Sequence, residues 1–230
     1  MNKFLTKSME KIFNTLGSNL DEFKDKTILI TGANGLIGGF LSEFFMYLND
    51  EHDFNSKLVL TSLSDDPKRL GNLIYRKDVQ YYSRDLTNDS WFFDEIDFCI
   101  YCAGYAQPNK FLSDAEKTYQ LNVDAMVRTF QSVMFERKKS KMLFISSSEV
   151  YALNDITKPH CETDELKLDL WHKRAPYIIG KVTGEYNVGL LREKGYNVKS
   201  ARVSLCYGPG HVMEDTRVMS ELTLKGIENE

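Results

Sequence analysis

The stretch that decides the fold of this sequence runs Thr27-Ile28-Leu29-Ile30-Thr31-Gly32-Ala33-Asn34-Gly35-Leu36-Ile37-Gly38-Gly39. Residues 27–30 are a short apolar, β-branched run, which predicts a strand, and residues 36–48 have the apolar spacing of a helix. The glycines between them permit positive φ angles and let backbone N–H groups approach an anion closely. Their three-residue spacing makes the loop one residue longer than the commonest dinucleotide-binding turn. The stretch therefore predicts that a dinucleotide pyrophosphate binds at Gly32, Asn34, Gly35, Leu36, Ile37 and Gly38.

Strand and helix patterns alternate along the rest of the chain. Apolar runs predict five more strands, at residues 57–61, 79–82, 97–102, 141–146 and 196–205. Between them, helical patterns predict a short polar segment at residues 67–73, a long helix from Asp114 to Arg137, and a helix from Tyr177 to Lys194. Such alternation produces right-handed crossovers, so the predicted fold is α/β, a doubly wound and mostly parallel Rossmann sheet. Ligands of these sheets bind at the carboxyl ends of the strands.

The composition is that of a soluble globular protein. The chain has 230 residues, 42% hydrophobic and 27% charged, which is enough to form a sizeable core. A formal net charge of −4 provides no basic field, so neither nucleic acid nor a membrane surface is an expected partner. No apolar stretch approaches the roughly 20 residues that span a bilayer. Residues 1–25 instead predict an amphipathic helix, because Phe4, Met9 and Phe13 recur near helical spacing before Gly17.

The cysteines do not predict a metal site. Cys99 and Cys102 have the spacing of a redox or zinc pair, but they lie in an apolar run and no second pair follows. We therefore expect both to be small buried hydrophobic residues. Together with Cys161 and Cys206, they fit a protein with reduced thiols in the cytoplasm.

Tyr177 and Lys181 stand four residues apart in a predicted helix, so their side chains project from one face. An ammonium group beside a phenol favours the ionised phenol and lowers its pKa from about 10 toward neutrality. A tyrosine in this state is a general acid/base. Together with the glycine turn, the pair suggests a tyrosinate that moves a proton while a nicotinamide moves a hydride.

An ordered series of motifs resembles the extended short-chain dehydrogenases/reductases, in particular the NAD-dependent epimerase/dehydratase family that modifies nucleotide sugars. The resemblance extends from about Lys26 to Gly210. It rests on these segments: Thr31 to Gly38, Arg84-Asp85-Leu86, Cys102-Ala103-Gly104, Leu121-Asn122-Val123, Ser146 to Tyr151, Tyr177 to Lys181, Arg202-Val203-Ser204 and Tyr207-Gly208-Pro209-Gly210.

The resemblance implies an NAD site along this series. Asp85-Leu86 would contact the adenine, and Ala103-Gly104 would line the ribose and the pyrophosphate. The turn at Tyr207 would close over the nicotinamide. Lys181 would bond the nicotinamide ribose as well as assist Tyr177.

The resemblance also implies the residues that act on a nucleotide-sugar substrate. Ser147 would hydrogen-bond the sugar O4, and Tyr177 would take its proton as C4 loses a hydride. The resulting ketone acidifies C5–H and activates a C5 carboxylate for loss. Glu149 resembles the glutamate of the family's dehydratases and decarboxylases, whereas simple 4-epimerases usually have a small or uncharged residue there. Ser148, where some dehydratases have aspartate, and Ser204 would lie near the substrate.

Several alternatives stay open at this point. The enzyme could be a nucleotide-sugar 4-epimerase or an NADPH-dependent keto-sugar reductase. A non-catalytic NAD(P)-sensing or scaffold protein could keep the same fold. Glu149 could merely accept backbone hydrogen bonds in a loop, and Asn122 is more typical of a structural helix residue that ties neighbouring strands together.

The choice between NAD and NADP rests on the end of the second predicted strand. Near Thr61 there is no acidic residue for the adenosine 2′-hydroxyl and no arginine for a 2′-phosphate. Lys68 and Arg69 follow later, where they could simply be solvated. We expect NAD, with NADP as the alternative.

The family resemblance also predicts the domain organisation and the assembly. We expect an N-terminal helical extension at residues 1–25, an NAD(P)-binding Rossmann domain at 26–212, and the start of a truncated substrate-binding region at 213–230. Most of the small C-terminal substrate domain would then be missing. Members of the family dimerise through four helices, which predicts a homodimer formed by the helices at residues 114–137 and 177–194.

Overall fold

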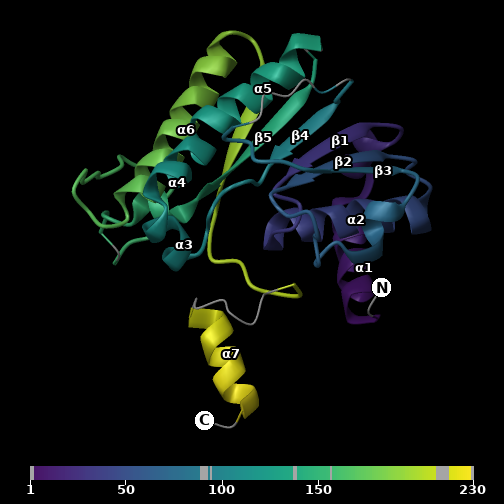
Figure 1. Ribbon diagram of the computed structural model, residues 1–230, viewed down its shortest axis with the longest axis horizontal. Coiled ribbons are helices and arrows are strands. Elements are labelled where there is room, and N and C mark those ends of the chain that lie inside the picture. The colour runs from purple at the N-terminus through teal and green to yellow at the C-terminus, as the bar shows by residue number, and fades with distance from the viewer. Residues whose placement is uncertain are drawn as a thin grey trace.

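The computed structural model describes residues 3–88, 93, 95–136, 139–155, 157–210 and 218–228. Within this part of the chain, one sheet has the strand order β3-β2-β1-β4-β5-β6, and all neighbouring strands are parallel (Figure 1). The strands are β1 (Thr27–Thr31), β2 (Lys57–Ser62), β3 (Val79–Ser83), β4 (Phe98–Tyr101), β5 (Lys141–Ser147) and β6 (Asn197–Val203). Each lies where the sequence predicts a strand, and the doubly wound Rossmann fold is confirmed.

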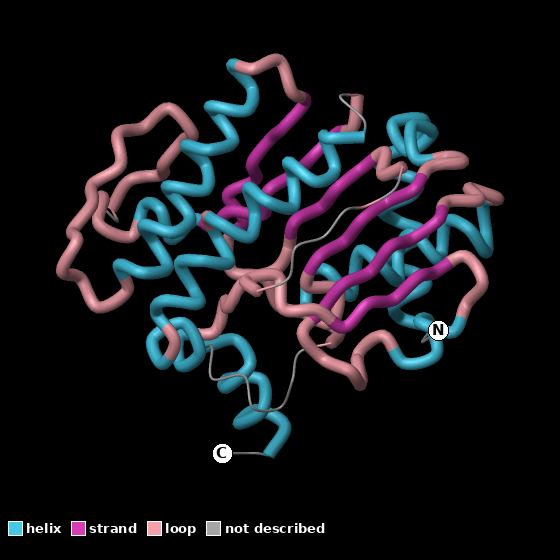
Figure 2. The backbone as a smooth tube through the Cα atoms, turned by 45° about the horizontal axis from the view of Figure 1, so that its top comes forward, coloured by secondary structure: helices cyan, strands magenta, loops and turns pink. Residues whose placement is uncertain are grey.

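Helices cover both faces of the sheet (Figure 2). On one face lie α1 (Lys3–Leu16) and α2 (Leu36–His52), and on the other lie α4 (Ala115–Asn122), α5 (Asp124–Glu136) and α6 (Ala175–Glu193). The shorter connecting elements are α3 (Pro108–Ser113) and the 3₁₀ helices η1 (Gly17–Phe23), η2 (Gly71–Tyr75) and η3 (Ser148–Tyr151). The helix α7 (Val218–Glu228) lies apart from the sheet in Figure 1.

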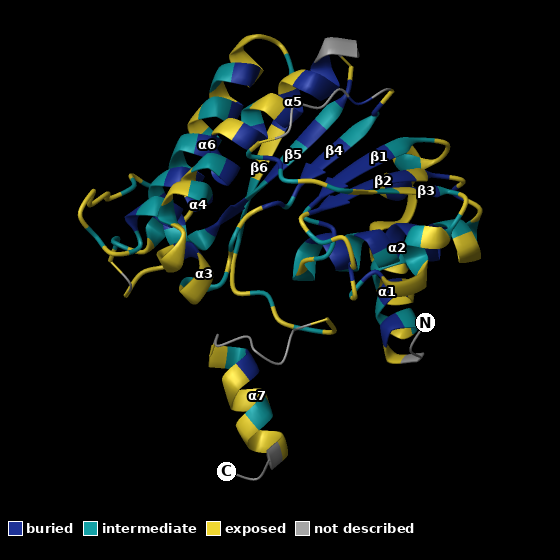
Figure 3. Cartoon of the chain, in the orientation of Figure 1, coloured by how far each residue is buried: buried dark blue, intermediate teal, exposed yellow. Residues whose placement is uncertain are grey.

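The strands alternate their side chains between two hydrophobic cores. Leu29 and Cys99 belong to the core beneath α4, α5 and α6, whereas Ile28 and Ile30 belong to the core beneath α1 and α2. The central strands are therefore buried on both faces (Figure 3), as a parallel sheet requires. The predicted amphipathic helix at the N-terminus is α1, and its fully buried Met9 belongs to the second core.

The predicted long helix from Asp114 to Arg137 is wrong: two helices, α4 and α5, occupy this region and meet at Val123. Asp114 is the cap of α4, with its side chain accepting a hydrogen bond from the backbone N–H of Lys117. At the other end, the Asn122 amide bonds the Thr118 carbonyl, and Asp124 supplies an acidic residue to the first turn of α5. Arg137 lies outside the described residues.

The predicted helical stretch at residues 67–73 is also wrong. It is a turn in which Leu70 N–H bonds the Pro67 carbonyl, followed by η2 from Gly71 to Tyr75. A single proline and few apolar residues gave this segment only a weak helical pattern, and tertiary contacts decide its shape. None of the described helices is both long and apolar enough to cross a membrane.

The strand order reverses its direction between β1 and β4. The chain moves outward from β1 to β2 and β3, then returns to β4 on the other side of β1. At this switch point the connections leave in opposite directions and open a crevice at the carboxyl ends of the strands. The fold thus brings the segments that follow β1, β4, β5 and β6 to one edge of the sheet.

Candidate active site

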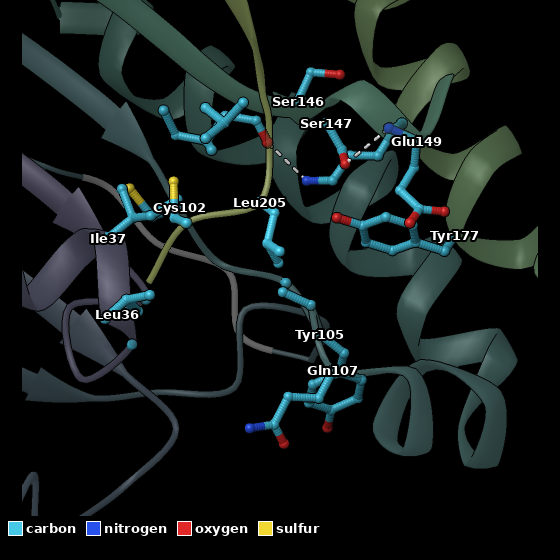
Figure 4. A pocket seen from close by; sticks show the side chains of 18 of the residues that line it. Leu36, Ile37, Cys102, Tyr105, Gln107, Ser146, Ser147, Glu149, Tyr177 and Leu205 are labelled. Carbon is cyan, nitrogen blue, oxygen red and sulfur yellow. Dashed lines mark hydrogen bonds between the residues drawn. The ribbon is translucent and has the colours of Figure 1, made fainter. Parts of the chain in front are cut away.

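A pocket of about 630 Å³ lies at this edge of the sheet. Its walls come from the glycine turn after β1, the segment after β4, the start of η3 after β5, the first turns of α6, and the chain that follows β6 (Figure 4). The volume suits a small-molecule ligand or cofactor. The sequence-predicted residues in its lining are Gly32, Asn34, Gly35, Leu36, Ile37, Gly38, Gly104, Ser147, Ser148, Glu149, Tyr177, Lys181 and Ser204.

The glycine turn leaves no room for side chains at two positions. Gly32 has φ +64°, and a Cβ there would lie 2.9 Å from the backbone of Ala103. At Gly38 a Cβ would lie 2.5 Å from the Gly32 carbonyl oxygen. α2 begins at Leu36, directly after its N-cap Gly35, and its first residues line the pocket. The first N–H groups of a helix have no partner within the helix, so they are available to a ligand there. This bare, positively polarised cradle fits a dinucleotide pyrophosphate.

Arg69, treated above as a solvated side chain, braces the glycine turn instead. Only 10% of its side chain is exposed. Its guanidinium pairs with Glu43 of α2 at 3.1 Å and bonds the Pro209 carbonyl at 2.9 Å. Its backbone N–H bonds the Asn34 side chain at 3.1 Å. Arg69 thus connects the glycine turn to the segment after β6. Its positive charge is already paired with Glu43.

Tyr177 lies in the first turn of α6 and Lys181 in the second, both on the pocket side, as their spacing predicts. The Lys181 ammonium lies 5.7 Å from the centre of the Tyr177 ring and donates a hydrogen bond to the Ile145 carbonyl at 2.7 Å. Burial lowers the pKa of Lys181 to about 8, against the opposing influence of Cys102 and Glu185. At neutral pH the group is therefore mostly an ammonium beside the phenol, which is the state that favours a tyrosinate.

Ser147 and Glu149 come from the junction of β5 with η3. Ser147 caps this 3₁₀ helix, accepting a hydrogen bond from the Glu149 N–H at 3.2 Å. Figure 4 shows the Ser147 hydroxyl, the Tyr177 phenol and the Glu149 carboxylate on one wall of the pocket. A hydroxyl, a phenol and a carboxylate that converge in this way can bind a polyol and move its protons.

Two residues next to this wall were not predicted from the sequence to belong to the site. Arg174, the residue before α6, forms an ion pair with Glu149 at 2.5 Å and lines the pocket. Phe111 of α3 stacks on the Tyr177 ring, with 4.8 Å between ring centres. Arg174 could have been noticed as a cation three residues before the tyrosine. Nothing local marks Phe111, because its contact joins segments 66 residues apart in number (177 − 111).

Cys102 is not the strand residue that the sequence predicts, because β4 ends at Tyr101 and Cys102 lines the pocket. Burial raises the pKa of its thiol to about 12, so it stays neutral. Cys99 is buried as predicted. Among the described residues, no cluster of histidine, cysteine or carboxylate side chains is arranged to hold a metal ion.

Other predicted residues do not line this pocket. Asp85 pairs with Lys117 at 2.6 Å, and although burial acts to raise its pKa, hydrogen bonds from Lys117 and Thr87 hold that pKa below its usual value. Leu86 and Ala103 are buried in the core beneath α4–α6. Tyr207 is 66% exposed.

Asn122 is fully buried beside the pocket. Its Oδ1 lies 3.5 Å from the position that a Cβ on Gly104 would take, and has no hydrogen-bond partner in the described part of the chain. The Asn122 amide N–H₂ bonds the Thr118 carbonyl within α4, so it does not tie neighbouring strands together as expected.

Curated proteins of similar sequence modify nucleotide sugars. UDP-glucuronic acid decarboxylase 1 of Xenopus tropicalis is 25% identical over 214 residues, which cover 92% of this chain and 48% of that protein. The dTDP-4-dehydro-6-deoxy-D-allose reductase of Streptomyces bikiniensis is 24% identical over 86% of this chain and 61% of that protein. The chain spans about half the length of the decarboxylases that it matches.

Solved structures share the fold. UDP-glucuronic acid 4-epimerase from Bacillus cereus, in complex with UDP-glucuronic acid and NAD, superposes with a TM-score of 0.69 at 19% identity. That match covers 89% of this chain and 64% of the epimerase. The dTDP-glucose 4,6-dehydratase from Bacillus anthracis superposes with a TM-score of 0.67 at 17% identity, covering 89% of this chain and 62% of that enzyme.

Residues 28–230 of the chain also match the sequence pattern that describes one protein family. That range begins in β1 and includes the glycine turn, the pocket wall after β5, and the tyrosine–lysine pair. The chain therefore belongs to the NAD dependent epimerase/dehydratase family.

Proposed function

We propose that this protein is an NAD-dependent nucleotide-sugar enzyme that oxidises its sugar at C4 and then dehydrates or decarboxylates the 4-keto intermediate. The observation that carries the proposal is the shared pocket. Ser147, Glu149, Tyr177 and Lys181 line the same cavity as the glycine turn. A dinucleotide on the turn would leave its nicotinamide end and the sugar between these side chains.

The residues present fit NAD. The turn from Gly32 to Gly38 and the N-terminus of α2 would hold the pyrophosphate, and Lys181 would reach the nicotinamide ribose. When bound, NAD supplies a hydride acceptor for C4 of the sugar. Arg69 is already paired with Glu43, so it offers no free cation for the 2′-phosphate of NADP.

The protein's own residues would carry the protons of the first step. Tyr177, as the phenolate, removes the proton from the sugar O4, and the Lys181 ammonium stabilises the phenolate. The Ser147 hydroxyl holds O4 in place. The O–H bond breaks as the C4–O bond becomes a carbonyl.

Glu149 would act in the second step. With a 6-hydroxy sugar, its carboxylate removes the acidified C5 proton and passes it to the departing C6 hydroxyl, which leaves as water. With a uronate, the bond from C5 to the carboxylate breaks, carbon dioxide leaves, and the electron pair left at C5 takes up a proton. In either case the hydride would return from the reduced cofactor to the sugar, at C6 after dehydration and at C4 after decarboxylation, so that NAD is regenerated. The expectation that Glu149 only accepts backbone hydrogen bonds gains no support from its contacts, since its carboxylate pairs with Arg174.

The second candidate is a keto-sugar reductase, which the similarity to the Streptomyces reductase supports. Such an enzyme consumes reduced cofactor, whereas the proposed enzyme regenerates its NAD in each turnover. A 4-epimerase would regenerate NAD as well but leave the substrate mass unchanged. A non-catalytic sensor would bind NAD and change no sugar.

Mass spectrometry of the protein incubated with NAD and a panel of uridine, thymidine, guanosine and cytidine diphosphate sugars separates these cases. We expect one sugar to lose the mass of water or of carbon dioxide without net reduction of NAD. An unchanged mass with inverted stereochemistry would support the epimerase. In a parallel sample with NADPH and a 4-keto nucleotide sugar, stoichiometric oxidation of NADPH would support the reductase. No change in any sugar would contradict the proposal.

A further inference from the structure

Within the part of the chain that the structure describes, one side chain, Arg174, holds the carboxylate of Glu149. Its Oε1 atom pairs with Nη2 of Arg174 at 2.5 Å, and both side chains are about two-thirds buried. Its Oε2 atom is buried and has no hydrogen-bond partner among the described residues. The direction in which this carboxylate points therefore depends on Arg174.

Arg174 in turn contacts Phe111, the aromatic ring that stacks on Tyr177. Its guanidinium lies 5.3 Å from the centre of the Phe111 ring, and Phe111 stacks on Tyr177 with an angle of 15° between the ring planes. Phe111 is 1% exposed, so this ring cannot move without disturbing the packing around it. A continuous set of contacts thus runs from Glu149 through Arg174 and Phe111 to Tyr177.

We propose that Arg174 is a positioning residue that fixes the Glu149 carboxylate relative to Tyr177, so that the second proton transfer follows the oxidation at C4. This inference rests on the proposed function. Tyr177 and Glu149 come from different elements, α6 and η3, and each must reach a neighbouring carbon of the same sugar. Misplacement by about 1 Å can cost about 100-fold in rate, so a fixed spacing matters.

An arginine suits this role better than a lysine. A guanidinium is planar, so its edge can bond a carboxylate while its face lies on an aromatic ring. The compact lysine ammonium can do one of these with ease but not both. The Arg174 Nε atom is buried and has no hydrogen-bond partner among residues 3–88, 93, 95–136, 139–155, 157–210 and 218–228, so the side chain makes one contact with Glu149 rather than two parallel bonds.

The test compares wild type, Arg174→Met, Arg174→Lys, Glu149→Gln and the double variant Glu149→Gln/Arg174→Met. Each NAD-loaded protein is given the nucleotide sugar that wild type converts, and formation of the dehydrated or decarboxylated product and nicotinamide absorbance are followed. We expect Arg174→Met to form this product about 100-fold more slowly while NAD is still reduced, so that reduced nicotinamide accumulates. Arg174→Lys should restore part of the rate. The double variant should be no slower than Glu149→Gln, because both changes affect one group.

Arg192→Met is the matched control, since Arg192 is an exposed arginine in the last turn of α6. It should match wild type in both readouts. An Arg174→Met protein with normal product release, with both steps slowed equally, or with losses that multiply in the double variant would overturn the inference. If Arg174→Met does not fold, the partial loss in Arg174→Lys decides. A wild type that neither reduces NAD nor alters any nucleotide sugar would instead contradict the proposed function itself.

Discussion

At the scale of single residues, the candidate site depends on a buried positive charge, the ammonium of Lys181. Lys181 is 6% exposed yet remains close to Tyr177 in the pocket wall. Burial lowers its pKa, and its ammonium donates its hydrogen bond to a backbone carbonyl. Burying a cation in this way costs stability, and the tyrosine gains a positive neighbour in return.

The lowered pKa of Lys181 predicts how stability changes with pH. With a pKa of about 8 when folded and 10.5 as the ordinary value, the unfolded chain binds more protons between these values. The free energy of unfolding should therefore rise with pH across this window, by up to roughly 3 kcal/mol. Comparing urea unfolding of wild type and Lys181→Met across this pH range, both without NAD, isolates the contribution of Lys181 to the free energy of unfolding. Parallel curves for the two proteins between pH 8 and pH 10.5 would show that Lys181 is not buried as described.

A second residue-scale prediction concerns the glycine turn. In Gly38→Ala the new Cβ would meet the Gly32 carbonyl oxygen at 2.5 Å, so the loop must move away from the pyrophosphate position. We expect NAD affinity, measured by calorimetry, to fall about 100-fold or more, since several backbone hydrogen bonds would be lost. Gly189→Ala is the control, because nothing lies within 4 Å of its added Cβ. Equal NAD affinity in the two variants would argue against pyrophosphate binding at the turn.

At the scale of elements, α6 carries the proposed catalytic pair, Tyr177 and Lys181, and the position of this helix depends on close packing. A Cβ on Gly184 would lie 2.6 Å from the Phe144 ring of β5 and 2.8 Å from the Asn122 carbonyl oxygen of α4. The glycine therefore lets α6 approach both its strand and its neighbouring helix. Three residues before Gly184, Lys181 then reaches the Ile145 carbonyl in β5.

This close approach predicts opposite effects of the same substitution within one helix. Gly184→Ala should lower the free energy of unfolding by about 1 to 3 kcal/mol, because the extra methyl overpacks the interface with β5. Gly189→Ala should raise it by up to about 1 kcal/mol, because alanine is the better helix former and the site is open. Chemical denaturation of both variants checks the sign. Stabilisation by Gly184→Ala would mean that α6 packs less closely on β5.

The sequence predicted elements well where one short pattern decides them. The buried strands are unbroken apolar runs, and the tyrosine–lysine pair follows from spacing within one helix. Prediction from the sequence failed where contacts between distant segments determine the structure. The break at Val123 does not interrupt the helical pattern, Arg69 is drawn out of solvent by Glu43 and Pro209, and Arg174 meets Glu149 only when α6 packs beside η3.

At the scale of the whole molecule, topology assembles the site. Residues from Gly32 to Ser204 reach one pocket because four parallel strands end at the same edge of the sheet. The chain covers about half of its decarboxylase relatives, and its pocket already combines a dinucleotide cradle with three acid/base or hydroxyl groups. We propose that the cofactor cradle and these acid/base groups act on one substrate in this pocket.

The assembly can be tested at the same scale. We expect a homodimer in which α4, α5 and α6 of two copies pack together, and Tyr119 and Tyr186 are large aromatic residues exposed on these helices. Tyr186→Glu should place a charge in that interface and shift the protein toward monomer in analytical ultracentrifugation. Tyr75→Glu, at an exposed site on η2, should leave the mass unchanged. A monomeric wild type would contradict the expectation.

We propose above that Tyr177 moves the proton in a nucleotide-sugar oxidation at a bound NAD. The most direct test is Tyr177→Phe, which removes one oxygen and keeps the ring stacked on Phe111. Product formation from the nucleotide sugar that wild type accepts and NAD affinity are measured on the same samples. We predict that kcat falls by about 1000-fold while the Kd for NAD changes only a few-fold. Undiminished turnover in Tyr177→Phe would contradict the account.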